Sequence, residues 1–251
     1  VRVTQDWNPG DYARFSTLRL RPALDLLAQV AGLPEGDVVD LGCGAGAAAE
    51  ALLQRFQGRR LIGVDLSAAM LAEAVGYHRL EDADIATWRP GAAPALIFSN
   101  AALHWLPDHG SLMPRLARLM APGGTLAVQM PGQHDAPSHR LLREAAARLF
   151  PSRFTLADWQ PPVADPADYW TLLSPFGTVA AWETEYLQHL PPSADGHPVR
   201  AFTASTAMRP WVAGLTEPEV RAFVDAYDAA LGEAYPLLPD GSALMPFRRV
   251  F

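Results

Sequence analysis

The stretch "VVDLGCGAGAAAEALL", residues 38–53, constrains the fold more than any other part of the chain. Four residues, Val38 to Leu41, predict a buried parallel strand, and the alanines and leucines after Gly46 predict a helix packed against it. Three glycines on alternate positions mark the turn between them. Glycine permits otherwise strained backbone angles, and without Cβ atoms a ligand can lie on the main chain beside the N–H groups of the helix start. The stretch therefore predicts a loop that binds a nucleotide-like ligand.

Short apolar runs alternate with helical segments over the next eighty or so residues. Strands are predicted at 38–43, 60–67, 95–100 and 125–130, with a weaker one near 78–85, and two late apolar stretches, 179–190 and 242–251, are expected to complete the sheet. This alternation predicts an α/β fold with a parallel sheet and a binding crevice at the carboxyl ends of its strands. Ahead of the sheet, residues 9–30 predict one or two helices, broken near Pro22.

Composition excludes several classes of protein. A chain of 251 residues fits one large domain or a domain with a subdomain. Its net charge of -7 argues against a protein that coats a nucleic-acid backbone. All 20 basic residues are arginine, so arginine is the only strong cation. The single cysteine, Cys43, excludes an internal disulfide and is expected to be a small filler among the loop glycines. His104 and His109 lack acids at ligand spacing, so we expect no metal. Without a long apolar run, we expect no membrane contact and a soluble, cytoplasmic protein.

Two acidic residues, Asp40 and Asp65, reduce the number of ligands that fit this loop. Asp40 stands two residues before the first glycine, and the third glycine comes one position earlier than in a nicotinamide fingerprint. A carboxylate facing the site would repel a pyrophosphate and favour a cationic ligand, which disfavours a dehydrogenase. Asp65 closes the next predicted strand, nineteen residues after Gly46 (65 minus 46), where an acid can accept hydrogen bonds from both ribose hydroxyls. Its alternative role is to cap the following helix, which Ser67 could do instead.

A third acid, Asp84, follows the weaker strand. It could accept a hydrogen bond from an adenine amino group, with Ile85 and Met70 as apolar walls, or these could be ordinary turn residues. A ligand with a ribose, an adenine and an amine but no phosphate is S-adenosylmethionine.

The segments "VVDLGCGAG", "GVDLSAAM", "DADI" and "FSNAALHW" together resemble the class I S-adenosylmethionine-dependent methyltransferases. The resemblance implies a Rossmann-like sheet of seven strands with the last one antiparallel, N-terminal helices, and a helical cap inserted before the last strand. It implies a single domain over 1–251, with a helical lid at 1–30, a cofactor-binding core at 31–131 and the cap at 193–236. S-adenosylmethionine would be the cofactor and S-adenosylhomocysteine its product. The implied cofactor contacts are Asp40, Gly42, Gly44, Gly46, Asp65, Leu66, Met70, Asp84, Ile85 and Asn100.

Segments outside the cofactor loop, among them "DWNPGDYARF", "LHWLPDH" and "TAMRPWVAGLTEPE", are similar to members of this family that esterify a carboxylate of a small polycarboxylate such as trans-aconitate. One departure is His104, where we expect a glutamine. A carboxylate is already ionised at pH 7, so its attack on a sulfonium methyl needs alignment rather than a strong base. The nearest alternatives are a methyltransferase for another acid, such as malonyl carrier protein, and a binding protein without turnover.

An anionic acceptor requires cationic side chains to bind its carboxylates, and the planar guanidinium of arginine suits this role. The candidates are Arg14, Arg19 and Arg21 in the N-terminal helical segment and Arg209 in the cap, and Tyr12 is a further candidate for contact with the acceptor. Arg19 and Arg21 are two apart and diverge on a helix, so at most one faces the site. Arg209 could instead pack within its helical segment.

His104 and Trp105 follow the fourth predicted strand, at the position of methyl transfer in related enzymes. His104 could donate a hydrogen bond to the acceptor or cap the next helix, while Trp105 is expected to pack against cofactor or core. The protein would act as a monomer or homodimer.

Overall fold

The computed structural model describes residues 16–251, with side chains from residue 20 on. The described chain forms two compact units. The first, here the sheet unit, comprises 16–131, Pro162–Thr184 and Arg249–Phe251. The second, the helical unit, comprises Gly132–Pro161 and Glu185–Arg248.

The sheet unit is built on parallel strands, of which the central ones are mostly buried. Its strands are β1 (Val38–Leu41), β2 (Leu61–Asp65), β3 (Arg79–Asp82), β4 (Leu96–Asn100) and β5 (Thr125–Pro131). β1 pairs in parallel with β2 and β4, β2 with β3, and β4 with β5. Because β1 and β4 are buried on both faces, their sequences are mostly apolar.

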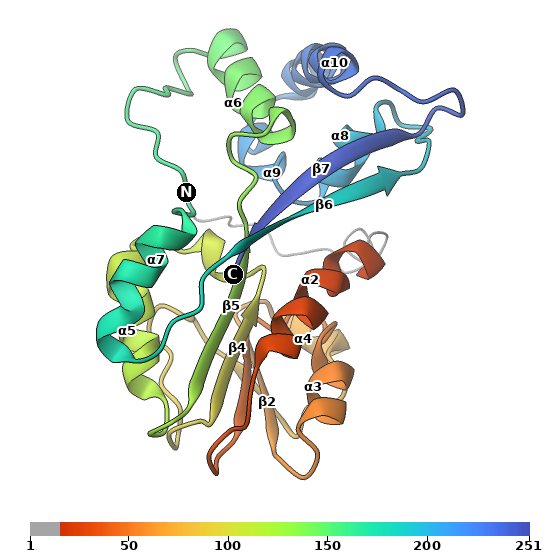
Figure 1. Cartoon of the computed structure of the whole chain (residues 1–251). Coiled ribbons are helices and arrows are strands. Elements are labelled where there is room, and N and C mark those ends of the chain that lie inside the picture. The colour runs from red at the N-terminus through yellow and green to blue at the C-terminus, as the bar shows by residue number, and fades with distance from the viewer. Residues whose placement is uncertain (1–15) are drawn as a thin grey trace. The chain divides into compact units, whose positions relative to one another are not determined.

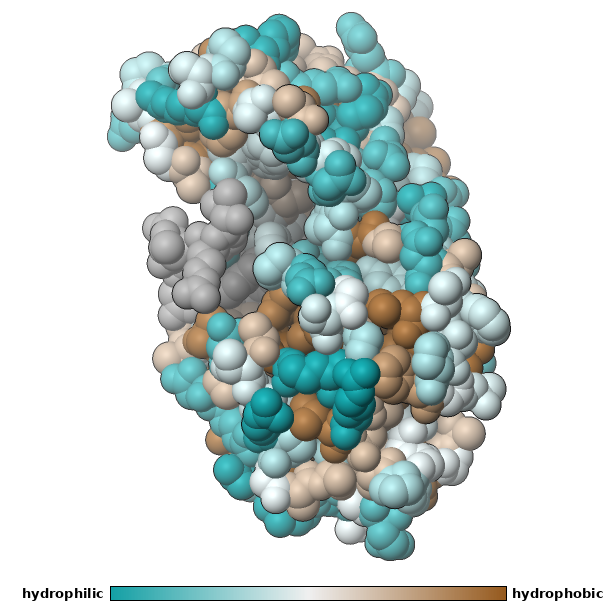
Figure 2. Space-filling view, turned by 90° about the vertical axis from the view of Figure 1, so that its left-hand side faces the viewer, coloured by the Kyte–Doolittle hydropathy of each residue, from teal (hydrophilic) through white to brown (hydrophobic). Residues whose placement is uncertain are grey.

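Helices cover both faces of these strands, as Figure 1 shows with α2 and α3 on one side and α5 and α7 on the other. Their bounds are α2 (Ser16–Gln29), α3 (Ala49–Arg55), α4 (Ala68–Glu73), η1 (Leu103–Trp105), α5 (His109–Leu119), α7 (Pro166–Leu173) and η2 (Ser174–Phe176). Figure 2 views the side of α5 and α7, where apolar patches lie between hydrophilic ones. The exposed ring of Phe176 in η2 packs under the guanidinium of Arg118 on α5, whose Cζ lies 4.7 Å from the ring centroid.

The expected break near Pro22 is wrong, because α2 runs without interruption through this residue. Proline removes one backbone N–H and crowds the preceding turn, which disfavours the helix locally. The buried face that follows offsets this cost: Ala23, Leu26 and Leu27 are at most 6% exposed. Tertiary burial therefore outweighs the local signal.

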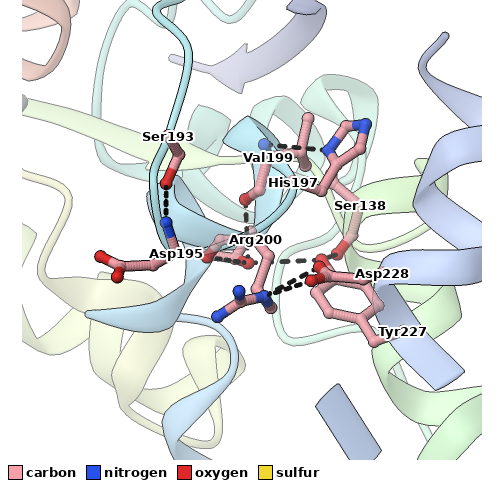
Figure 3. A network of polar contacts seen from close by, with 9 residues as sticks. Ser138, Ser193, Asp195, His197, Val199, Arg200, Tyr227 and Asp228 are labelled. Atoms are coloured by element: carbon pink, nitrogen blue, oxygen red, sulfur yellow. Dashed lines mark hydrogen bonds and ion pairs between the residues drawn. The ribbon is translucent and has the colours of Figure 1, made fainter. Parts of the chain in front are cut away.

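The helical unit contains α6 (Pro137–Leu149), α8 (Pro198–Ala204), α9 (Arg209–Val212) and α10 (Glu217–Ala234), together with most of β6 (Glu183–Leu190) and β7 (Ala243–Val250). Buried and partly buried polar contacts join its helices (Figure 3). The Tyr227 hydroxyl on α10 donates to the Ser138 carbonyl on α6 over 2.6 Å, and Arg200 on α8 donates to the carboxylate of Asp228 on α10 over 2.8 Å. These bonds join three helices that also pack through buried apolar side chains, among them Leu142, Phe202 and Phe223.

The complete sheet has seven strands in the order β3-β2-β1-β4-β5-β7-β6. The last strand, β7, pairs antiparallel with the end of β5, with Met130 opposite Val250 and Pro131 opposite Arg249. The predicted seven-stranded α/β class with a reversed final strand is therefore confirmed, and every predicted strand is present. Within the described chain, no helix has both the length and the apolar character needed to cross a bilayer.

Candidate active site

The glycine loop joins β1 to α3 and takes the left-handed backbone that its sequence predicts. Gly42, Gly44 and Gly46 have φ values of +82°, +54° and +92°. A Cβ on Gly42 would lie 2.2 Å from the Cβ of Ala102, which no side chain can tolerate. The backbone N–H groups of Gly42 and Cys43 both donate to the Val64 carbonyl, over 2.8 and 3.0 Å. The loop is thereby held against the end of β2.

Asp65 at the end of β2 is bonded to this loop. Its Oδ2 accepts from the Gly44 N–H over 2.8 Å, and its Oδ1 accepts from the Ser67 N–H over 2.9 Å. The helix cap belongs to Ser67, whose hydroxyl accepts from the N–H of Met70. A carboxylate has about four lone-pair positions, so two bonds leave acceptor capacity for ribose hydroxyls. Leu66, beside it, is 65% exposed.

Apolar side chains lie against the loop where an adenine is expected. Met70 and Ile85 are 5% and 8% exposed. A Cβ on Gly44 would lie 3.2 Å from Cε of Met70, and one on Gly42 would lie 3.5 Å from Cδ1 of Ile85. The structure therefore brings these two side chains to the glycine loop, although they are distant in sequence.

The turn that carries Asp84 and Ile85 is held from outside by an arginine that the sequence reasoning missed. Arg115 on α5 donates to the carbonyl of Ile85 over 2.5 Å and to that of Trp88 over 2.8 Å. Burial is the main cause that lowers the pKa of Arg115. Asp84 itself accepts from the Ala86 N–H over 2.9 Å, which is the turn role that sequence analysis left open. Only the fold could reveal Arg115, which lies thirty residues from Ile85.

Asp40 does not present an open carboxylate, contrary to the expectation that it faces the ligand. It is 2% exposed, and the hydroxyl of Tyr77 donates to its Oδ2 over 2.7 Å. Space for the tyrosine ring comes from Gly63, opposite Asp40 in the sheet, where a Cβ would lie 2.9 Å from Cδ1 of Tyr77. Burial raises the pKa of Asp40 to about 7, the Tyr77 hydrogen bond opposes this, and the Asp65 charge adds to it. Its assignment to the cofactor stays a prediction.

Polar groups also gather at the end of β4. Asn100 is partly exposed, and its Oδ1 is buried without a hydrogen-bond partner among residues 16–251. The next residue, Ala101, has φ of +54°, an uncommon conformation for a non-glycine residue and typical of functional turns. The buried amide oxygen is an acceptor available to a ligand amine.

His104 and Trp105 lie in η1, with ring centroids 4.7 Å apart. The alternative role of His104 as a helix cap is excluded, because the Asp108 side chain caps α5. Trp105 is 39% exposed, so it does not belong to the core. His109 holds this turn in place: its Nε2–H donates to the Leu103 carbonyl over 2.9 Å, and its Nδ1 accepts from the Tyr169 hydroxyl over 2.6 Å.

The predicted arginine clamps are not brought together within one unit. The Arg21 side chain is 74% exposed and lies 4.0 Å from Asp25, as expected for whichever of the paired arginines points outward. For Arg19 the structure describes only a helical backbone, and Tyr12 and Arg14 lie outside the described residues. Arg209, half-buried, begins α9 in the helical unit. In the described part of the chain no cluster of three or more His, Cys, Asp or Glu side chains could hold a metal ion.

Comparison with known proteins agrees with this architecture. A family model described as a methyltransferase domain matches residues 12–189. The YcgJ protein from Bacillus subtilis has a similar fold, with a TM-score of 0.56 at 15% identity over 92% of this chain and 96% of that one. Phosphoethanolamine N-methyltransferase 2 of Haemonchus contortus, solved with S-adenosylhomocysteine, has a TM-score of 0.52 at 16% identity over 96% of this chain and 57% of that one. The fold is that of class I S-adenosylmethionine-dependent methyltransferases.

A relative from Paracidovorax citrulli, named trans-aconitate 2-methyltransferase, is 41% identical over 98% of this chain and 96% of its own length. Further bacterial relatives with that name, from Methylobacterium radiotolerans and Escherichia coli, are 43% and 41% identical over 98% of the chain. The chain belongs to the family of S-adenosylmethionine-dependent methyltransferases that contains the trans-aconitate 2-methyltransferases.

Proposed function

We propose that this protein transfers a methyl group from S-adenosylmethionine to one carboxylate of a small polycarboxylate, trans-aconitate, and releases S-adenosylhomocysteine. The observation that carries the proposal is the likeness to enzymes of that name over nearly the whole chain, including the segments outside the cofactor loop. Segments outside the loop carry the acceptor specificity, because the loop itself is shared by methyltransferases of every substrate class.

The residues at the carboxyl ends of β1, β2 and β4 fit the cofactor. Asp65 has acceptor capacity for the ribose hydroxyls, and Met70 and Ile85 offer apolar walls for the adenine. The buried Oδ1 of Asn100, without a partner among the described residues, suits an N–H of the amino-acid end. The glycine backbone between them permits close approach. Bound S-adenosylmethionine supplies a methyl group on a positively charged sulfur.

The protein's own contribution to the chemistry is positioning. An acceptor carboxylate is ionised near neutral pH, so no side chain has to remove a proton. Alignment of the carboxylate oxygen with the methyl carbon can supply roughly 7 to 11 kcal/mol in favourable cases. His104 and Trp105 on η1 are our candidates for orienting the acceptor, and Arg209, Arg19, Arg21 and Tyr12 for binding its other carboxylates.

We further propose that residues 31–131 bind the cofactor and that 1–30 and 193–236 contribute acceptor contacts. The helices α8, α9 and α10 lie within the range 193–236. We propose a cytoplasmic location because the single cysteine, Cys43, is a buried free thiol, which suits a reducing compartment. A monomer or homodimer would suffice for a small-molecule acceptor.

The test is methyl transfer from labelled S-adenosylmethionine to trans-aconitate, cis-aconitate, citrate, isocitrate and malonyl carrier protein. We expect strong preference for trans-aconitate. Preference for malonyl carrier protein would refute trans-aconitate as the acceptor and support the alternative function, methylation of malonyl carrier protein. Cofactor binding without transfer to any acceptor would refute the substrate, and binding of a nicotinamide cofactor instead would refute the reaction class.

A further inference from the structure

A buried arginine, Arg249, lies at the end of β7 and is not among the predicted cofactor or acceptor contacts. Arg249 is 3% exposed. Its neighbour Arg248 is half-buried and donates from Nε to the Gly132 carbonyl over 2.9 Å. Along β7 the buried positions alternate, since Ala243, Met245 and Phe247 are at most 4% exposed, and Arg249 continues this series. A charge therefore occupies a position at which the strand otherwise buries apolar side chains.

The pairing of the strands places Arg249 beside two amides. Pro131 lies opposite Arg249, and Asn100 lies opposite Gln129. Because Gln129 and Pro131 are two residues apart on β5, they share one face of the sheet. Asn100, Gln129 and Arg249 consequently lie on the same face, at the carboxyl ends of β4 and β5 and the end of β7. All three belong to the sheet unit.

Arg249 contacts the side-chain amide of Gln129. Nη1 of Arg249 lies 3.5 Å from Oε1 of Gln129. Gln129 is fully buried, and its Nε2 has no hydrogen-bond partner among the described residues. A buried amide NH₂ without a partner is costly, and such groups in native proteins call for an explanation. The oxygen of the amide contacts the guanidinium, and its NH₂ group remains a buried donor for a further acceptor.

We propose that Arg249 and Gln129 form a binding subsite for a carboxylate of the acceptor. The planar guanidinium matches the two oxygens of a carboxylate, and the Gln129 NH₂ adds a further donor. Neighbouring strands are about 4.8 Å apart, so the subsite lies one strand away from Asn100, which we assign to the cofactor. The inference rests on the proposed function and deepens it, because a carboxylate held here would lie beside the methyl donor.

The first test is Arg249→Met, with Arg248→Met as the matched control that removes the same charge from the adjacent residue. We expect Arg249→Met to raise the KM for trans-aconitate by about 10- to 150-fold, the range for one charge-assisted hydrogen bond. Affinity for S-adenosylmethionine by calorimetry should change little in both variants. Equal KM values for Arg249→Met and wild type would overturn the subsite.

A second variant, Gln129→Glu, separates binding from structural support. If Gln129 only supports the fold, a glutamate beside Arg249 forms an ion pair, and both melting temperature and KM stay at wild-type values or improve. If the pair binds a carboxylate, the new charge repels it and KM rises while the protein stays folded. A folded Gln129→Glu protein with the wild-type KM would overturn the proposal.

Failure of the proposed function is recognised separately, by wild-type protein that methylates no polycarboxylate. The subsite is then measured by calorimetry of trans-aconitate against the protein saturated with S-adenosylhomocysteine. Binding to wild type that is lost in Arg249→Met supports the subsite even without turnover. Absence of binding to wild type overturns it.

Discussion

Asp40→Asn tests how burial controls the charge beside the glycine loop. In the folded protein the pKa of Asp40 is about 7, against an ordinary value of 3.8. Between these values the folded protein retains a proton that the unfolded chain releases, so stability falls as pH rises from about 4 to about 7 and stays reduced above. The difference between these two pKa values corresponds to at most about 4 kcal/mol of folding stability.

Asparagine has no proton to lose and its amide oxygen can still accept from the Tyr77 hydroxyl, which donates to Asp40 over 2.7 Å in the wild type. At pH 8 we therefore expect Asp40→Asn to be more stable than wild type, with a melting temperature up to about 10 °C higher. Near pH 4 the two proteins should melt at similar temperatures. The assay is thermal unfolding followed by circular dichroism at half-unit intervals between pH 4 and 8.5.

Tyr77→Phe is the matched control for this prediction. It keeps the aromatic ring that fills the space beside Gly63 and removes only the donor, which lowers the pKa of Asp40 in the wild type. Its stability loss should continue to higher pH than in the wild type. A difference between Asp40→Asn and wild type that is constant across the pH range would refute the reasoning, because a shifted ionisation must produce a pH-dependent difference.

Three further predictions concern the site. Asp65→Ala removes the acceptor of the Gly44 N–H and should weaken S-adenosylmethionine binding far more than acceptor binding; calorimetry that finds equal losses would contradict the ribose assignment. Gly42→Ala should destabilise the protein by about 1 to 3 kcal/mol, because its Cβ would lie 2.2 Å from Ala102, and Ala102→Gly should restore part of this loss in denaturant unfolding; a double variant no more stable than Gly42→Ala would exclude the clash. Arg209→Ala should raise the KM for trans-aconitate at nearly unchanged cofactor affinity, and unchanged acceptor kinetics would remove it from the clamp.

Local patterns in the sequence were sufficient to predict the fold class and the cofactor loop. Buried parallel strands require continuous apolar runs, and a left-handed strand-to-helix turn requires glycine, so both are legible from neighbouring residues. The role of Ser67 as a helix cap was foreseeable for the same reason, because a cap bonds to the backbone only a few residues ahead. A further local signal is that Arg249 falls in the alternating series of buried positions along β7, with Ala243, Met245 and Phe247. The predicted cations, in contrast, all lie in helical segments.

Contacts between distant residues were decided only by the tertiary structure. Tyr77 reaches Asp40, Arg115 holds the turn at Ile85, and Arg249 meets Gln129 because strand pairing and helix packing bring them together. The same applies to α2, which continues through Pro22 because its following turns are buried. Periodicity and residue type indicate whether a side chain is buried. The partner of that side chain depends on which strands and helices lie beside it, and the partner in turn determines its charge and its chemistry.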